Sequence, residues 1–305
     1  MNKQSIGIIG MGWVGASVAI SVLQRGICSK LLVNDVKSEI AEGEAMDLNH
    51  GSSFFPSSEI RACAIDEMLD CAVIVITAGR GGKSGESRLD LLKDNIKIAE
   101  NIADKLKSYQ GILLIVANPV DVLTYYYQKF TGLPSSRVIG TGTMLDTARL
   151  RDIIGAKIQV DPKSIQANVI GEHGDSEVVL WNSARVANKL LLEWEGWDEK
   201  QTQEVNSEVK NAAQEIISRK GATNHAIGLV AATLIKWIVR SEKRVCNISS
   251  VQQDAYNLKE VALSLPSLIG ENGIEKIITV QLSEVEQRQL ARSAAILKDA
   301  IDSVG

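Results

Sequence analysis

The first part of the chain, residues 1–141, alternates short apolar runs with amphipathic segments of helical periodicity. The apolar runs are continuous rather than alternating, which is typical of strands buried on both faces of a sheet. Because parallel strands that alternate with helices are joined by right-handed crossovers, this pattern predicts a parallel, doubly wound α/β sheet. The predicted strands are Ser5–Ile9, Leu31–Asn34, Glu59–Ala64, Ala72–Thr77, Gly111–Ala117 and Arg137–Ile139.

In the second part, residues 142–305, strand-like and helical segments no longer alternate regularly, and no linker separates this part from the first. The segment 226–239 is apolar over most of its circumference, so we expect a helix that is buried or lies at a subunit interface. The patterns together predict an α+β domain. Its predicted strands are 164–170, 245–250 and 260–265, the last two antiparallel, and its predicted helices are 143–154, 199–218, 226–239 and 283–303.

Composition excludes several classes of protein. Lys and Arg number 33 against 37 Asp and Glu, and a net charge of −4 offers no basic surface for nucleic acid. No apolar run approaches the roughly 18 residues that a membrane helix needs, and the first residues do not resemble a secretory signal. The 4 cysteines lack metal-binding spacing. We therefore expect a cytoplasmic protein with no metal, no membrane association and no nucleic-acid partner.

A glycine-rich turn follows the first predicted strand and opens a helix, which is the context of a dinucleotide-binding fingerprint. The first glycine permits a tight turn, the second lets a pyrophosphate approach the backbone, and the third allows close packing of helix on sheet. Asp35 ends the second strand, where a carboxylate binds the ribose hydroxyls of NAD and repels the extra phosphate of NADP. A Rossmann-type NAD site is therefore predicted at Gly10-Met11-Gly12-Trp13-Val14-Gly15 and Asp35.

Three further clusters carry groups suited to proton transfer and anion binding. The glycine-rich loop 77–88 leaves a parallel strand and could fold over a substrate as a lid that carries Arg88. Asp146 and Arg149 lie one turn apart on a predicted helix, and His173 stands just after a predicted strand. A carboxylate beside a histidine makes an acid–base pair, and an arginine is a two-pronged donor for a carboxylate. By spacing alone, a solvated loop and a surface ion pair explain these clusters about as well.

Only 3 histidines are available for proton chemistry near neutral pH. His50 follows a helical segment, which favours a capping or surface position, and His225 receives no chemical role. Glu172 and Asp175 flank His173, and we expect both to make local hydrogen bonds. His173 stays a candidate for proton transfer on its position between glycines, and its catalytic role is implied by the family resemblance given next.

In their order along the chain, these motifs resemble the lactate/malate dehydrogenase family, in particular its L-lactate branch. Two further segments match, Asn118-Pro119-Val120-Asp121 and Lys220-Gly221-Ala222-Thr223. The resemblance spans most of the chain and implies reversible hydride transfer between NADH and a 2-oxo acid, giving the L-2-hydroxy acid. It also implies a glycolytic enzyme that assembles as a homo-oligomer, either a dimer or a tetramer.

The resemblance assigns a role to each matching residue. His173 would donate a proton to the 2-oxo group, Asp146 would orient its imidazole, and Arg88 would polarise the carbonyl as the lid closes. The substrate would be bound by Arg149, Arg88, Asn118, Thr223 and the chain at Gly82. The cofactor would be bound by Gly10, Met11, Gly12, Trp13, Val14, Gly15, Asp35, Thr77, Ala78, Gly79, Asn118 and Ile227.

The same resemblance divides the chain and predicts one unusual peptide bond. Residues 1–141 would form the NAD-binding Rossmann domain, and residues 142–305 the α+β substrate domain. The bond between Asn118 and Pro119 would be cis.

Two positions depart from the family's pattern. Gly82 stands where lactate-specific relatives carry Gln and malate-specific relatives carry Arg. We therefore expect a roomier pocket that accepts longer 2-oxo acids, and poor use of malate unless Arg80 or Lys83 reaches the substrate. Relatives activated by fructose 1,6-bisphosphate pair an Arg, here Arg151, with a His, here Gln166. We expect this activation to be weak or absent, because Gln carries no titratable charge.

Other functions compete with the leading hypothesis. Two alternatives use the same hydride transfer: malate dehydrogenase and a broad L-2-hydroxyisocaproate-type dehydrogenase. A redox-sensing NAD-binding protein is disfavoured because a sensor need not retain the groups of a proton relay. An NAD-dependent glycosidase is disfavoured because such enzymes use a metal, and no Cys/His ligand cluster stands near the cofactor motif.

Overall fold

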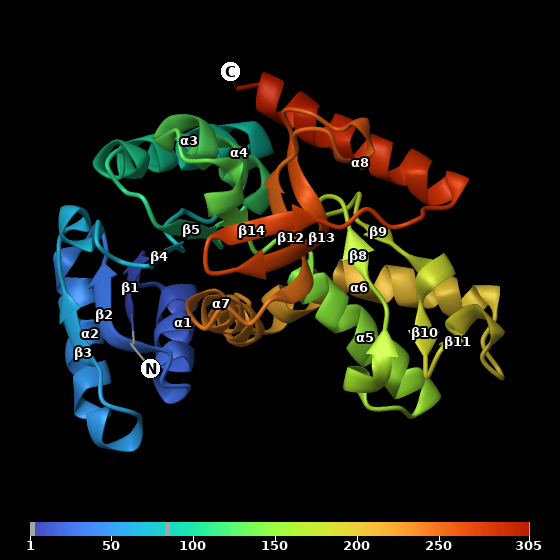
Figure 1. Cartoon of the computed structure of the whole chain (residues 1–305), viewed down its shortest axis with the longest axis horizontal. Coiled ribbons are helices and arrows are strands. Elements are labelled where there is room, and N and C mark those ends of the chain that lie inside the picture. Colours follow the sequence, from blue (N-terminus) through green and yellow to red (C-terminus); the bar gives the residue numbers. More distant parts are fainter. Residues whose placement is uncertain (1–3, 83–85, 305) are drawn as a thin grey trace.

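A mixed sheet of nine strands forms the centre of the part of the chain that the structure, a computed structural model, describes: residues 4–82 and 86–304 (Figure 1). Six parallel strands follow the order β6-β5-β4-β1-β2-β3, which confirms the predicted doubly wound sheet. Each lies within a few residues of its predicted position. They are β1 (Gln4–Ile9), β2 (Cys28–Asn34), β3 (Glu59–Ala62), β4 (Val73–Ile76), β5 (Ile112–Ile115) and β6 (Val138–Gly140).

Successive side chains of a strand point to opposite faces of the sheet. The parallel strands therefore contribute to two apolar cores, each closed by its own helices. Ile6 and Ile8 belong to one apolar core with α1, α2 and α7. Ile74 and Ile76 belong to another with α3 and α4, which lie above the sheet in Figure 1. These helices are α1 (Trp13–Gln24), α2 (Ser38–His50), α3 (Arg88–Lys105), α4 (Val120–Thr131) and α7 (His225–Val239).

The second part of the chain extends the sheet of the first. Strand β12 runs antiparallel to β6, with Ser249 opposite Gly140, and β13 and β14 follow as further antiparallel strands. The predicted antiparallel pair at 245–250 and 260–265 is therefore confirmed. The bounds are β12 (Arg244–Val251), β13 (Ala262–Gly270) and β14 (Gly273–Ile277).

The predicted strand at 164–170 is wrong as a single element, because the strand is interrupted at Ala167 and Asn168. Arg151 Nε donates to the carbonyl of Ala167 at 2.9 Å, and Leu180 N donates to the carbonyl of Asn168. The two halves join different small sheets, since β7 pairs with β10 and β8 pairs with β9. These strands are β7 (Ile165–Gln166), β8 (Val169–Ile170), β9 (Val178–Val179), β10 (Arg185–Val186) and β11 (Lys189–Leu190).

The remaining helices of the second part begin and end close to their predictions. They are α5 (Met144–Ile158), α6 (Glu199–Lys220) and α8 (Glu284–Asp302). Helix α7 packs along α1 so closely that a Cβ on Gly228 would lie 2.8 Å from the backbone of Ser17. Its Leu234 and Ile235 are fully buried, while Leu229 is exposed. Within residues 4–82 and 86–304, no helix is both long and apolar enough to cross a membrane.

Candidate active site

The turn after β1 meets the turn after β4 at the point where the strand order of the parallel sheet reverses. Gly10 has φ +101°, and a Cβ there would lie 2.5 Å from the backbone N of Ala78. A Cβ on Gly15 would lie 2.0 Å from the carbonyl oxygen of Gly10. Both positions therefore require glycine, and the chain is packed tightly at the crevice where open α/β sheets bind their ligands.

The N-terminus of α1 has the properties of a pyrophosphate site. Gly12 is its N-cap residue, and no hydrogen bond from a side chain caps the helix in the described structure. A Cβ on Gly12 would meet no atom within 4 Å, so the space above the first N–H groups is open. Unpaired N–H groups and the helix dipole favour an anion there. Trp13, the first residue of the helix, is exposed.

Asp35 follows β2 and lies beside this turn. Its Oδ2 accepts a hydrogen bond from Met11 N at 2.8 Å, and its Oδ1 accepts one from Lys37 N at 3.0 Å. The residue is partly exposed, so solvent or a ligand can approach it. Tight glycines, an uncapped helix N-terminus and a carboxylate at the end of β2 fit a bound NAD.

A cavity of about 420 Å³ continues from this turn between the two parts of the chain. Among its lining residues not predicted as site residues are Leu145, Ala213, Ile217 and Ala222, which give part of the wall an apolar character. Ala213 and Ile217 lie one turn apart on α6, a spacing that could have marked them as one helix face. Eight predicted residues also line the cavity: Val14, Thr77, Gly79, Asn118, Arg149, His173, Thr223 and Ile227.

His173 and Asp146 form a close pair at the wall of this cavity. Nδ1 of the imidazole lies 2.5 Å from Oδ2 of the carboxylate, and Asp146 is only 2% exposed. The other oxygen, Oδ1, accepts a hydrogen bond from Arg149 Nη1 at 2.8 Å. The structure thus joins the two predicted clusters, which are 27 residues apart in sequence, into one group of three side chains.

The charges of this group set its protonation. Burial disfavours a charged imidazole, but the carboxylate of Asp146 outweighs burial and raises the pKa of His173 to about 9. Burial also opposes the charge of Asp146, but His173 and Arg149 hold the pKa of that carboxyl below its ordinary value. At neutral pH the pair is therefore imidazolium and carboxylate, the form from which His173 can donate a proton.

The structure does not bring every predicted residue to the cavity. Arg88 begins α3 and is exposed, and neither Arg88 nor Gly82 is part of the cavity lining. Arg80 does line it, but its guanidinium pairs with Glu86 and Asp94. Malate was expected to be used poorly unless Arg80 or Lys83 reaches the substrate, and Arg80 is already engaged by two carboxylates. Lys83 lies outside the described residues.

The cis bond expected between Asn118 and Pro119 is present. The amide of Asn118 caps the start of α4, since its Oδ1 accepts a hydrogen bond from Val120 N at 3.3 Å. The buried side chain of Asn95 donates to the carbonyls of both Arg80 and Asn118, at 3.2 and 3.4 Å. The loop after β4 and the loop after β5 are therefore tied together at one end of the cavity.

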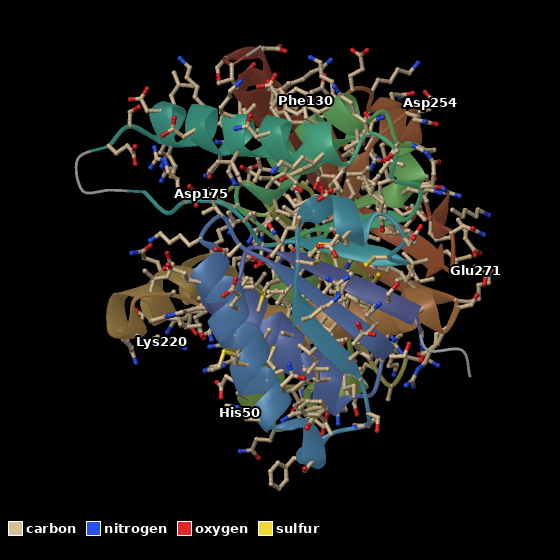
Figure 2. The ribbon with its side chains drawn as sticks, turned by 90° about the vertical axis from the view of Figure 1, so that its left-hand side faces the viewer. His50, Phe130, Asp175, Lys220, Asp254 and Glu271 are labelled. Atoms are coloured by element: carbon tan, nitrogen blue, oxygen red, sulfur yellow. The ribbon has the colours of Figure 1, made fainter. Side chains whose placement is uncertain are left out.

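The residues given minor roles lie away from the acid–base pair or serve local structure. His50 ends α2 in an exposed position, well below Asp175 in Figure 2, and His225 begins α7 in an exposed position. Glu172 accepts hydrogen bonds from Ser176, as expected. The expectation for Asp175 is wrong, because this side chain is exposed and makes no hydrogen bond in the described structure.

The two positions considered for sugar phosphate binding, Arg151 and Gln166, do not present a free positive charge. Arg151 donates to the carbonyl of Ala167 and to Asn168 Oδ1, so its guanidinium is engaged inside the fold. Gln166 is exposed on β7.

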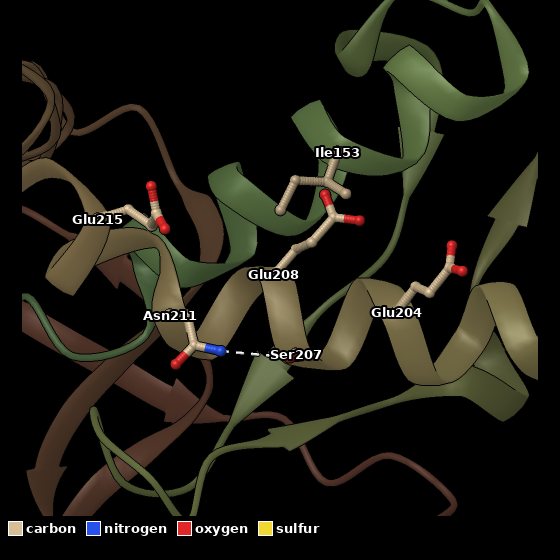
Figure 3. Close-up of a pocket in the computed structure, with 6 residues that line it drawn as sticks. All are labelled: Ile153, Glu204, Ser207, Glu208, Asn211 and Glu215. Atoms are coloured by element: carbon tan, nitrogen blue, oxygen red, sulfur yellow. Dashed lines mark hydrogen bonds between the residues drawn. The ribbon is translucent and has the colours of Figure 1, made fainter.

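A second hollow, of about 540 Å³, lies between α5 and α6 and is distinct from the cavity described above (Figure 3). Its wall is acidic, with Glu204, Glu208 and Glu215, and Lys157 pairs with the first two at 3.1 Å each. It contains none of the predicted residues. Among the described residues, no group of His, Cys, Asp and Glu could hold a metal ion.

Sequence reasoning missed two buried carboxylates near His173. Asp121 accepts a hydrogen bond from the backbone N of His173 at 2.7 Å, and it belongs to a matched motif, which is the signal that could have marked it. Glu177 follows His173 by four residues and is 8% exposed, with no hydrogen-bond partner for its Oε1 in the described structure. Burial and the charge of Asp146 raise the pKa of Glu177 to about 8.

The raised pKa of Glu177 predicts a stability effect that depends on pH. Unfolding returns the carboxyl to its ordinary pKa of 4.5, so between pH 4.5 and 8 the folded chain holds a proton that the unfolded chain has lost. The folded state therefore loses stability as pH rises through this window. Glu177→Gln should remove the effect and add about 3 kcal/mol of unfolding free energy at pH 7, but little near pH 4.5.

Denaturant unfolding of wild type and variant at both pH values, at one protein concentration, measures this difference. The exposed Glu195→Gln is the matched control. An equal effect of Glu177→Gln at both pH values would contradict the prediction.

A Rossmann crevice beside a histidine–carboxylate pair defines an oxidoreductase of the dinucleotide-dependent class. Residues 4–140 match the NAD binding domain of lactate/malate dehydrogenase, and residues 143–305 match the α/β C-terminal domain of the same family. The chain belongs to the lactate/malate dehydrogenase family. Its first part is the family's NAD-binding domain.

Individual relatives are similar over nearly their whole length. An L-lactate dehydrogenase of Synechococcus sp. (strain JA-3-3Ab) is 42% identical over 303 residues, which cover 97% of this chain and 98% of that protein. An L-lactate dehydrogenase of Clostridium botulinum (strain Loch Maree / Type A3) is 38% identical over 309 residues, covering 99% and 97%. The solved structure of the minor L-lactate dehydrogenase from Enterococcus mundtii, in the ligands-bound form, has a TM-score of 0.97 at 36% identity and covers 100% of this chain and 99% of that one.

Proposed function

We propose that this chain is an NAD-dependent L-2-hydroxy-acid dehydrogenase of the L-lactate type. The observation that carries the proposal is the buried contact of 2.5 Å between His173 and Asp146 beside Arg149, at a cavity that continues from the dinucleotide crevice. The names of the relatives support the reaction class, since each is an L-lactate dehydrogenase.

In the direction of reduction, His173 donates its proton to the 2-oxo group. Its pKa of about 9 keeps the imidazole charged at neutral pH, so the proton is available when the substrate arrives. Asp146 accepts a hydrogen bond from Nδ1–H, which stabilises the imidazolium and leaves Nε2 to donate to the substrate. In the reverse direction the same pair accepts the proton of the hydroxy acid.

Arg149 binds the substrate carboxylate. Its planar guanidinium presents parallel N–H groups that match the two oxygens, and Nη1 is already oriented by Asp146. A two-bond contact fixes which face of the 2-oxo carbon is presented to the cofactor. Arg88, exposed at the start of α3, would polarise the carbonyl of the 2-oxo acid.

The residues assigned to the cofactor lie along the crevice. Gly12 and the start of α1 would hold the pyrophosphate, Asp35 the adenine ribose, and Asn118 with Ile227 the nicotinamide end. Bound NADH supplies the hydride that is added to the 2-oxo carbon. The apolar side chains of Val14, Leu145 and Ile227 exclude water from this end of the cavity.

We further propose that the substrates are 2-oxo acids at least as large as pyruvate. Gly82 is exposed and carries no side chain, so the loop after β4 brings no bulk or charge to the substrate from this position. Ala213, Ile217 and Ala222 form an apolar part of the cavity wall, and none of them carries a positive charge. A second carboxylate, as in oxaloacetate, would find no free charged partner there among the described residues, because Arg80 is paired.

The test is the rate of NADH oxidation with pyruvate, oxaloacetate, 2-oxoisocaproate and phenylpyruvate, repeated with NADPH. We expect reduction of the monocarboxylates with NADH, poor use of oxaloacetate, and better kcat/KM for at least one longer acid than for pyruvate. Gly82→Gln should shift the preference toward pyruvate by about tenfold, because it restores the side chain that lactate-specific relatives carry at this position of the loop. A kcat/KM for pyruvate equal to or above that of every longer acid argues against the roomy pocket. Inactivity on all four argues against the dehydrogenase.

The cell context and assembly belong to the same proposal. We propose that the enzyme acts in the cytoplasm and serves glycolysis, with residues 1–141 binding NAD and residues 142–305 completing the substrate site. We also propose a homo-oligomer, as the family resemblance implies. The oligomer size can be read from light scattering.

A further inference from the structure

Asp121 joins the two parts of the chain at the active site. It is the second residue of α4, three residues after Asn118, and it is 2% exposed. Its Oδ2 accepts the backbone N–H of His173 at 2.7 Å, although the two residues are 52 apart in sequence. Its Oδ1 is buried with no hydrogen-bond partner in the described structure.

Three elements from both parts of the chain meet at this carboxyl group. Helix α4 carries Asp121 itself, the segment between β8 and β9 carries His173 and Glu172, and β12 carries Ser249. The hydroxyl of Ser249 is buried and approaches the carboxyl closely enough to oppose the rise in its pKa. Burial is the larger effect and raises the pKa of Asp121 to about 6, so the group is mostly ionised at neutral pH.

We infer that Asp121 is a positioning residue for His173, which fixes the backbone of the histidine to the turn that carries Asn118. This inference rests on the proposed function. His173 is then held at two points, its ring by Asp146 and its backbone by Asp121. Because Asn118 lines the cofactor end of the cavity, the bond from Asp121 sets the distance between the proton donor and the cofactor.

The charge of Asp121 has a second consequence. A neutral acceptor would satisfy one backbone N–H equally well, whereas a buried carboxylate requires compensation. The first turn of α4 supplies part of this, since a helix N-terminus stabilises an anion. The carboxylate in turn favours the charged imidazole, adding to the effect of Asp146 on the pKa of His173. Asp121 therefore affects both the position and the acidity of His173.

Two variants separate these effects. Asp121→Ala leaves the N–H of His173 without its acceptor, and we expect kcat to fall about 100-fold while KM for the 2-oxo acid changes less than about threefold. Asp121→Asn keeps an acceptor of the same shape without the charge. We expect it to recover kcat to within about tenfold of wild type and to lower the pKa of His173 by about one unit. Glu286→Gln, a buried carboxylate that caps α8, is the matched control with unchanged kcat and His173 titration.

The titration of His173 is followed by NMR in the protein without substrate. The chain has only 3 histidines, and exposed His50 and His225 are internal references. The inference is overturned if both variants keep the wild-type kcat and the wild-type titration of His173. It is also overturned if Asp121→Asn is no more active than Asp121→Ala. If Asp121→Ala does not fold, the titration and kcat of Asp121→Asn decide. If the wild type reduces no 2-oxo acid, the proposed function fails, while the titration still tests the link from Asp121 to His173.

Discussion

Replacing His173 by asparagine is expected to lower kcat/KM for reduction of the 2-oxo acid by about 10³-fold. The variant loses the proton donor, and asparagine cannot take up or release a proton near neutral pH. It also leaves Asp146 buried without the imidazole that lies 2.5 Å away. The measurement is the steady-state rate of NADH oxidation at saturating cofactor, compared with wild type across the pH range 6–10.

The pH dependence distinguishes loss of the acid from general damage. In wild type, kcat/KM for reduction should fall as pH rises through about 9, where the free enzyme loses the proton of His173. This fall should vanish in His173→Asn, whose residual rate is flat. NADH binding, followed by fluorescence, should change little, and His50→Asn is the matched control at the end of α2. A variant that keeps more than a tenth of the activity would show that another group donates the proton.

Replacing Arg149 by lysine is expected to have the second-largest effect, a loss of about 10²- to 10³-fold in kcat/KM. Lysine keeps the positive charge but presents a single point of contact in place of the planar fork, so the substrate carboxylate is no longer held in one orientation. The substitution also weakens the hydrogen bond from Arg149 to Asp146. Most of the loss should appear as a raised KM for the 2-oxo acid, with a smaller fall in kcat.

The control for this variant is Arg61→Lys, at an exposed arginine paired with Glu67 on the surface. Inhibition by oxamate, a carboxylate that mimics the substrate, should weaken in parallel with KM in Arg149→Lys. An unchanged KM together with unchanged inhibition would place the substrate carboxylate on a different residue.

Most elements could be predicted because their sequence signals are local. Strand β1 was predicted at 5–9 and found at Gln4–Ile9, since a continuous apolar run buried on both faces is visible in the residues themselves. The strand predicted at 164–170 failed for the opposite reason. Its residues are apolar enough for one strand, but Arg151 and Leu180, from other parts of the chain, bind the carbonyls of Ala167 and Asn168 and interrupt it.

In the candidate site, too, local features could be predicted and contacts between distant residues could not. The glycine turn could be assigned from sequence because Gly10 and Gly15 leave no room for a side chain, a constraint that acts within one turn and its immediate neighbours. Asp146 and Arg149 were placed on one helix face by spacing alone. That Asp146 rather than another carboxylate contacts His173 came from the resemblance to a family. Asp121 and Glu177 were not identified as members of the site.

The sequence by itself determined the parallel sheet and the dinucleotide turn, because each depends on neighbouring residues, and the resemblance to a family selected His173 from 3 histidines. Only the tertiary structure decided which carboxylates surround that histidine. Asp121 and Asp146 lie 52 and 27 residues from it, and their contacts depend on how α4 and α5 pack against the segment after β8. Burial in that packing raises the pKa of Glu177 and of Asp121, and proximity to Asp146 raises that of His173. Desolvation and charge proximity are properties of the folded core, so no local pattern of residues encodes them.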